Sequence, residues 1–337
     1  MKLRKAIGTV LALALLITGC GTVSDISLSY HLDDKKQLTI YTSHKEAVYL
    51  PIIQEFEERT GIWVDIVDGG TNEMLETIRQ EQDCPRADVM FGGGIESLDA
   101  YRDCFVPYTT SEAEAIAPAY QDADACWTPF SALPVVLIYN CKLVDPANLT
   151  GWADLLSFQG QVAFADPGIS ASSFTALVTM CTALEDTIGH TIETLTQALG
   201  GKPLESSGEV ITAVAAGKAL VGITLEETAM QAISSGYDIA IVYPKEGTSC
   251  VPDGSALIKN APHCENAKRF LDFTVSCDTQ SRLQDQNNRR SVRRDLSAPD
   301  VLPPLEMLKL VDYDIDWACR HRDSILEQWE NQMETLP

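Results

Sequence analysis

Short apolar runs alternate with amphipathic helical segments near the start of the chain, and this alternation constrains the fold more than any other feature. The runs at 38–42, 63–67 and 87–91 have the length and apolar character of buried strands. The segments 47–60 and 72–82 between them repeat apolar residues with a helical period. Strands that alternate with helices build a parallel α/β unit, and ligands bind such units at the loops that follow the carboxyl ends of the strands.

A second series of apolar strands and helices fills the middle of the chain, and the tail 303–336 has the apolar spacing of helices. The 337 residues are too many for one core, so two α/β domains are expected. The expected elements of the second unit are strands at 135–139, 161–165, 220–224, 239–243 and 255–259, and helices at 172–184, 210–216, 226–234 and 266–277.

The first 20 residues follow the order of a bacterial export signal. Basic residues among the first five positions precede an uncharged apolar run at 6–18. That run is too short for a membrane-spanning helix, because a span needs about 20 apolar residues. The following Ile-Thr-Gly-Cys resembles a lipobox, which implies that residues 1–19 are removed and that Cys20 carries a lipid. We therefore expect an extracytoplasmic protein that is lipid-anchored to the outer face of the cell membrane.

The net charge narrows the possible partners. The whole chain carries −23, and removal of the three basic residues of the signal takes the mature chain to about −26. Such a chain repels nucleic acid and anionic lipid, so it should contact the membrane through its anchor alone. Residues 20–36 are polar and lack a helical period, so we expect a tether there. The protein is expected to be a monomer.

The cysteines give no metal motif. Of ten cysteines, Cys20 is assigned to the lipid, and the nine others form no C-x-x-C or C-x-x-H spacing. We expect a mixture of disulfides and buried thiols, without assigned pairs. The sequence also contains no G-x-S-x-G, H-E-x-x-H or phosphate-binding P-loop pattern. Neither a cofactor nor an enzymatic activity is therefore expected.

Several segments together resemble the ABC-transporter solute-binding proteins of the ferric-ion-binding type. The opening strand, polar loop and helix run into F-E-x-x-T-G-I before the second strand, as in that family. Other segments resemble the third strand with its glycine loop, the two crossovers between domains, and a helix that ends in S-x-x-x-Q. The segments that carry the resemblance are 38–66, 87–94, 127–140, 222–229, 242–259 and 267–280.

The resemblance implies a periplasmic-binding-protein-like fold of type II, in which two α/β lobes joined by crossover strands close on a ligand. Lobe 1 would comprise 37–130 and 255–295, and lobe 2 would comprise 131–254 and 296–337 with the C-terminal helices. The implied function is capture of a small solute outside the membrane and its delivery to ABC permease subunits.

Iron is one possible cargo. The iron-binding members have a ligand histidine at the position of His44, an acidic residue after the third strand and a Tyr-Tyr pair in the second lobe. Here 92–94 are glycines, and 225–227 read Leu-Glu-Glu. If iron binds, His44 and Glu226 are the expected ligands, although ferric iron prefers harder oxygen donors such as phenolates.

A small anionic solute is the leading alternative, because the segment 166–173 runs directly into a helix. The first N–H groups of a helix are free and lie at its positive end, so they bind phosphate or phosphonate oxygens. An ordinary helix cap by Ser170 or Ser172 explains the same residues. Glu226 could bind a ligand amine, in which case an aminophosphonate fits. The expected ligand-binding residues are Thr42, Ser43, His44, Gly70, Thr71, Gly93, Ser131, Ser170, Ala171, Ser172, Ser173 and Glu226.

Three functional hypotheses therefore stand. The first is an ABC-importer lipoprotein for a phosphorylated metabolite or a phosphonate. The second is a ferric-iron receptor of the same fold, and the third is a sensory lipoprotein that reports ligand to a membrane kinase. The basic cluster 289–294 could reach the cleft or contact the permease, but such a run is most often a solvated surface, so we assign it no ligand.

Overall fold

The computed structural model describes residues 33–335. The expected signal peptide, the lipid-attachment residue Cys20 and most of the expected tether lie outside the described residues. Within the described part, no helix is long and apolar enough to cross a membrane.

The first lobe contains the parallel α/β unit that the sequence predicts. Strand β1 pairs in parallel with β2 on one side and with β3 on the other. Phe56 and Phe91 are fully buried in its core, between the sheet and the helices. Its elements are β1 (Gln37–Thr42), α1 (Glu46–Thr60), β2 (Trp63–Asp68), α2 (Thr71–Gln80), β3 (Val89–Gly94) and the short α3 (Ile95–Ala100).

The second lobe is the other predicted α/β unit, although it holds a helix that the sequence pattern did not indicate, α5 (Ile188–Ala198). Phe164, Phe174 and Trp152 fill its core. Its other elements are β5 (Val162–Ala163), α4 (Ala171–Ala183), α6 (Ser207–Ala215), β6 (Val221–Leu225), α7 (Glu226–Ser234) and β7 (Ile239–Val242).

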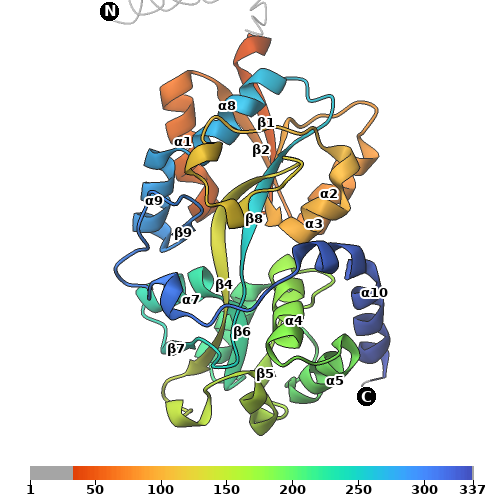
Figure 1. Cartoon of the computed structure of the whole chain (residues 1–337), viewed down its shortest axis with the longest axis vertical. Helices are drawn as coiled ribbons and strands as arrows, with labels where there is room; N and C mark the ends of the chain where they lie inside the picture. The colour runs from red at the N-terminus through yellow and green to blue at the C-terminus, as the bar shows by residue number, and fades with distance from the viewer. Residues whose placement is uncertain (1–32, 336–337) are drawn as a thin grey trace, which may run out of the picture. The chain divides into compact units, whose positions relative to one another are not determined.

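Two long antiparallel strands, β4 (Thr128–Asn140) and β8 (Cys250–Leu257), join the lobes (Figure 1). β8 pairs with β3 of the first lobe, and the second half of β4 pairs with β6 of the second lobe. The sheet order is therefore β2-β1-β3-β8-β4-β6-β5. This arrangement confirms the predicted fold of two α/β lobes with crossover strands. The residue boundaries predicted for the lobes stay a prediction.

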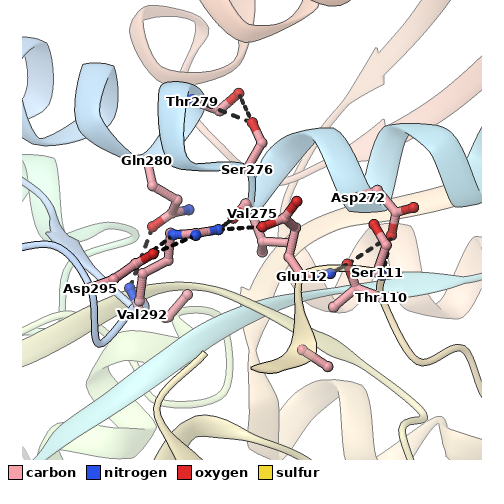
Figure 2. A network of polar contacts seen from close by, with 12 residues as sticks. Thr110, Ser111, Glu112, Asp272, Val275, Ser276, Thr279, Gln280, Val292 and Asp295 are labelled. Carbon is pink, nitrogen blue, oxygen red and sulfur yellow. Dashed lines mark hydrogen bonds and ion pairs between the residues drawn. The ribbon is translucent and has the colours of Figure 1, made fainter. Parts of the chain in front are cut away.

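After β8 the chain returns to the first lobe as α8 (Cys264–Thr274), α9 (Cys277–Asn287) and the two-residue strand β9 (Arg290–Ser291). One helix was predicted here; two form because Ser276 caps α9 by accepting a hydrogen bond from Thr279 N. Figure 2 shows how this region holds the loop at 110–112. Asp272 accepts hydrogen bonds from Thr110 Oγ1 at 2.7 Å and from Ser111 N at 3.0 Å.

The tail forms one long helix, α10 (Ile315–Glu334), instead of being helical from residue 303. Residues before it are extended because Val311 N donates to Thr248 O, and Thr248 N donates to Lys309 O, both at 2.9 Å. Helix α10 contacts α3 of the first lobe and α5 of the second. Its residues Ala318, Ile325 and Trp329 are buried in the second lobe's core.

Replacing Trp329 by alanine should lower the free energy of unfolding by about 3–5 kcal/mol, because it leaves a cavity at a fully buried aromatic position. The Trp329 side chain is 1% exposed and packs edge-on against Phe164. Urea denaturation measures the change. The control is Trp63→Ala, whose side chain is 59% exposed and whose loss should cost less than about 1 kcal/mol. Equal losses in the two variants would contradict this assignment of the core.

Candidate ligand-binding site

Residues from both lobes line a cavity of about 350 Å³. Six helices begin at its wall, because in each strand–loop–helix unit the helix starts close to the carboxyl end of the strand. The N-cap residues of these helices all line the cavity: Lys45 for α1, Gly70 for α2, Gly94 for α3, Ser170 for α4, Ser206 for α6 and Leu225 for α7.

The start of α4 lacks a side-chain cap among the described residues and carries several hydroxyls. Ser170 holds the N-cap position, but within the described chain no side chain caps the first turn of α4. The Ser170 hydroxyl instead lies 3.0 Å from the Ser172 hydroxyl and accepts a hydrogen bond from Ser173 Oγ at 3.2 Å. The first N–H groups of α4 therefore remain available to an anion, together with two hydroxyls.

Glycines bring backbone close to the cavity on the first lobe. Gly92 and Gly93 have φ angles of 97° and 116°, which favour glycine. A Cβ on Gly92 would lie 2.9 Å from the ring of His44, and a Cβ on Gly93 would lie 3.0 Å from Thr71. The end of β3 is therefore glycine-rich because His44 and Thr71 occupy the space that side chains would need.

His44 is a buried, neutral imidazole. Its ring lies 4.6 Å from the Phe91 ring and 5.0 Å from the Phe130 ring, centroid to centroid. Burial lowers the pKa of His44 well below its usual value, and the nearby charge of Arg289 lowers it further. Its buried Nε2 lies 3.9 Å from Asp253 Oδ2 and has no hydrogen-bond partner among the described residues.

A buried ionic network closes the end of the cavity beside the crossover strands. Arg289 Nη1 donates to Asp253 Oδ2 at 2.8 Å and to Ser131 Oγ at 2.7 Å. Arg289 Nη2 donates to Glu227 Oε1 at 3.3 Å. Asp253 Oδ1 accepts two further hydrogen bonds, from the backbone N and the hydroxyl of Ser131, both at 2.8 Å.

The model for the family described as "Bacterial extracellular solute-binding protein" matches residues 38–286. This chain belongs to that family.

Known relatives of this solute-binding protein are distant. Iron uptake protein A1 of Synechocystis is 25% identical over 299 residues, which cover 83% of this chain and 82% of that protein. A protein of Salmonella typhimurium, provisionally named a 2-aminoethylphosphonate-binding periplasmic protein, is 24% identical and covers 73% of this chain and 74% of its own. The structure of AfuA from Actinobacillus pleuropneumoniae, with fructose-6-phosphate bound, superimposes with a TM-score of 0.82 at 21% identity, covering 89% and 99% of the two chains.

Most of the residues predicted to bind the solute lie together in the binding protein. The structure brings eight of them into the wall of the cavity, five from the first lobe and three from the second as the lobes were predicted. Those that line it are Ser43, His44, Gly70, Thr71, Gly93, Ser170, Ala171 and Ser172.

Four predicted residues lie outside the cavity lining, and each has another partner. Thr42 Oγ1 donates to Phe91 O at 2.7 Å, and Ser173 donates to Ser170. Ser131 is held by Arg289 and Asp253 behind the wall of the cavity. The prediction for Glu226 needs the clearest correction: Arg290 binds both of its carboxylate oxygens, at 2.7 and 2.8 Å, and Tyr243 also donates to it.

Sequence reasoning missed two charged residues of the wall, Asp253 and Arg289, and did not include Glu227 among the expected ligand-binding residues. The interpretation of 289–294 as a solvated cluster was wrong for Arg289, Arg290 and Arg293, which are 5%, 2% and 7% exposed. Asp253 was missed because Pro252-Asp253-Gly254 is typical of a turn, whereas pairing with β3 and β4 makes it part of β8. Ser206, a further lining residue, was also missed, although the sequence carries a signal for it: Ser206 and Glu209 have the spacing of a helix-capping pattern.

The residues expected to hold iron do not converge. Glu226 is occupied by Arg290, and the residues that line the cavity include no tyrosine. No group of three or more His, Cys, Asp or Glu side chains in residues 33–335 is placed to hold a metal ion. The nine described cysteines are all free thiols, in place of the expected mixture with disulfides.

Replacing Arg289 by methionine should destabilise the binding protein by about 3–5 kcal/mol, because Asp253 and Glu227 would remain buried without their cation. Both carboxylates are less than 10% exposed. Chemical denaturation measures the loss. The matched control is Arg294→Met at an exposed position of the same cluster, where a change below about 0.5 kcal/mol is expected. A loss in Arg289→Met no larger than in the control would argue against the network.

His44 should make stability fall as the pH drops. Its folded pKa is lowered, so below about pH 6.5 the unfolded chain takes up a proton that the folded protein does not. The resulting slope is at most about 1.4 kcal/mol per pH unit and should vanish above pH 7. Urea denaturation at pH 5.5 and 7.5 should show a smaller difference for His44→Gln than for the wild type. Equal differences would contradict a neutral buried His44.

Proposed function

We propose that this solute-binding protein captures a small solute that carries a phosphate or phosphonate group and delivers it to the permease subunits of an ABC importer. The observation that carries the proposal is the uncapped start of α4, whose free N–H groups and serine hydroxyls line the cavity. The N-termini of α1, α2 and α6 converge on the same space. Each helix end adds positive potential for an anion.

The composition of the cavity wall supports a phosphorus oxyanion over a bare metal ion. Hydroxyl and backbone donors at helix starts suit the several acceptor oxygens of such a group. Two similar proteins have matching ligands in their names: one is named for 2-aminoethylphosphonate, and AfuA holds fructose-6-phosphate. At about 350 Å³ the cavity is at the lower end of ligand pockets, which favours a compact solute.

Ferric ion is the second candidate cargo, because the neutral imidazole of His44 lines the cavity and a relative is named an iron uptake protein. The oxygen atoms near His44 are poorly placed to complete a ferric-ion site. Asp253 is already bound by Arg289, and Glu227 shares that cation.

The location and mode of action follow from the same proposal. We propose that Cys20 anchors the mature chain to the outer face of the membrane by its lipid, and that the protein acts there as a monomer. The family is extracellular, and Ile-Thr-Gly-Cys is typical of lipid attachment. The alternative is a sensory role. The same site would then bind the same ligand, but the partner would be a membrane kinase in place of the permease.

A thermal-shift panel on the mature protein tests the ligand class. Ethylphosphonate, aminoethylphosphonate or a sugar phosphate at 100 times its dissociation constant should add about 2.7 kcal/mol of stability, and ferric citrate should not. Ser172→Ala combined with Thr71→Ala should weaken binding at least about tenfold, since hydrogen bonds to a charged group contribute about 1.5–3 kcal/mol.

The matched control is the double variant Thr212→Ala with Ser324→Ala, because both are exposed helical hydroxyls away from the cavity. It should bind as the wild type does. A shift with ferric ion and none with any phosphorus compound would replace the proposal by the iron receptor.

A further inference from the structure

The two buried carboxylates of the cavity wall use their oxygens differently. Both oxygens of Asp253 are occupied, Oδ1 by Ser131 and Oδ2 by Arg289. Glu227 accepts its hydrogen bonds from the described residues on one oxygen only: Oε1 receives Thr228 Oγ1 at 2.8 Å and Arg289 Nη2 at 3.3 Å. Glu227 is 7% exposed and lines the cavity, so its Oε2 is left to a ligand.

The buried charges at this end of the cavity do not balance. Arg289 supplies one positive charge against the two negative charges of Glu227 and Asp253. His44 adds none, because burial keeps its imidazole neutral. Lys45 and Glu205, the other charged lining residues, are exposed and opposite in sign. One negative charge therefore remains without a buried counter-ion, and a buried charge of this kind is costly unless it is paired.

The cavity is thus polarised, with free helix N–H groups at the start of α4 and surplus negative charge at Glu227. We propose that Glu227 determines specificity by binding a cationic nitrogen at the end of the solute opposite its phosphorus group. This inference rests on the proposed function for the anionic end. The solute class is then a short zwitterion, an amino-substituted phosphonate or phosphate ester.

The same arrangement rejects solutes without the nitrogen. An alkyl phosphonate that lacks the amine would leave the free oxygen of Glu227 buried and unpaired in the presence of the negative phosphonate. Sites built around a hydrogen bond discriminate strongly against ligands that lack the matching group, because the protein partner is left unsatisfied. A hydroxyl in place of the amine would restore the hydrogen bond but not the charge balance.

Isothermal titration of the mature protein with three probes that share the ethylphosphonate skeleton tests the inference: aminoethylphosphonate, hydroxyethylphosphonate and ethylphosphonate. The wild type should bind the amine at least about tenfold more tightly than either probe that lacks the amine. Glu227→Gln keeps an acceptor oxygen for Thr228 and Arg289 but removes the surplus charge. The Glu227→Gln variant should bind aminoethylphosphonate more weakly and ethylphosphonate more tightly than the wild type does. A misfolded variant cannot produce affinity changes in opposite directions.

The control is Glu265→Gln, which removes an exposed carboxylate from the first turn of α8 and should leave all three affinities unchanged. If the wild type binds ethylphosphonate as tightly as the amine, the role of Glu227 is wrong while the anion site stands. Equal binding of the hydroxyl and amine probes would show that Glu227 recognises a neutral hydrogen-bond donor. That result would overturn the proposal that Glu227 binds a cationic nitrogen. If no probe binds the wild type, the inference fails, and the proposed function fails with it when the sugar phosphate of the thermal-shift panel does not bind either.

Discussion

The buried ion pair between Arg289 and Asp253 is the contact on which the arrangement of the binding cavity depends. It joins three parts of the chain that are far apart in sequence: β4 through Ser131, β8 through Asp253, and the turn before β9 through Arg289. Glu227 adds the start of α7 in the second lobe. Burying each of these charges alone would be strongly unfavourable. Each segment is therefore held in place because its buried charge is paired with a charge on another segment. The crossover strands are therefore fixed at the point where the two lobes meet the ligand.

Around that network, the direction of the chain explains why an acidic protein can attract an anion. In both lobes the helices begin near the carboxyl ends of strands, and the antiparallel crossover of β4 and β8 turns the helix starts of both lobes toward one cavity. Free N–H groups and helix dipoles then supply local positive potential, although the whole chain carries −23. The guanidinium of Arg289, which lines the cavity, is bound to Asp253 and Glu227 and is therefore not available to the solute. In the proposed mode of binding, the helix starts recognise the anion and Glu227 recognises the cation, from two different parts of the wall of one small cavity.

Helix α10 adds a second connection between the lobes, away from the crossover strands. It is buried in the second lobe's core by Ile325 and Trp329, yet Arg322 donates to Asn72 of α2 at 3.0 Å. Just before the helix, Tyr313 donates to Glu96 of α3 at 2.6 Å, and Thr175 of α4 donates to the same carboxylate at 2.9 Å. Burial raises the pKa of Glu96, and these donors oppose that shift. The contact between the starts of α3 and α4 is thus supported partly by the C-terminal segment.

The sequence alone determined the order and type of most elements, because strand and helix periods are local properties of consecutive residues. It also located the loops of the cavity, since these follow directly from where strands end; Ser43, Thr71 and Gly93 were found in this way. It could not determine which charges are buried, because Arg289 and Asp253 acquire partners only when β4, β8 and the turn before β9 come together. The choice between Glu226 and Glu227 depended on the same contacts: adjacent acids at a helix start look alike in sequence. Tertiary packing placed Arg290 on Glu226 and left an oxygen of Glu227 facing the cavity.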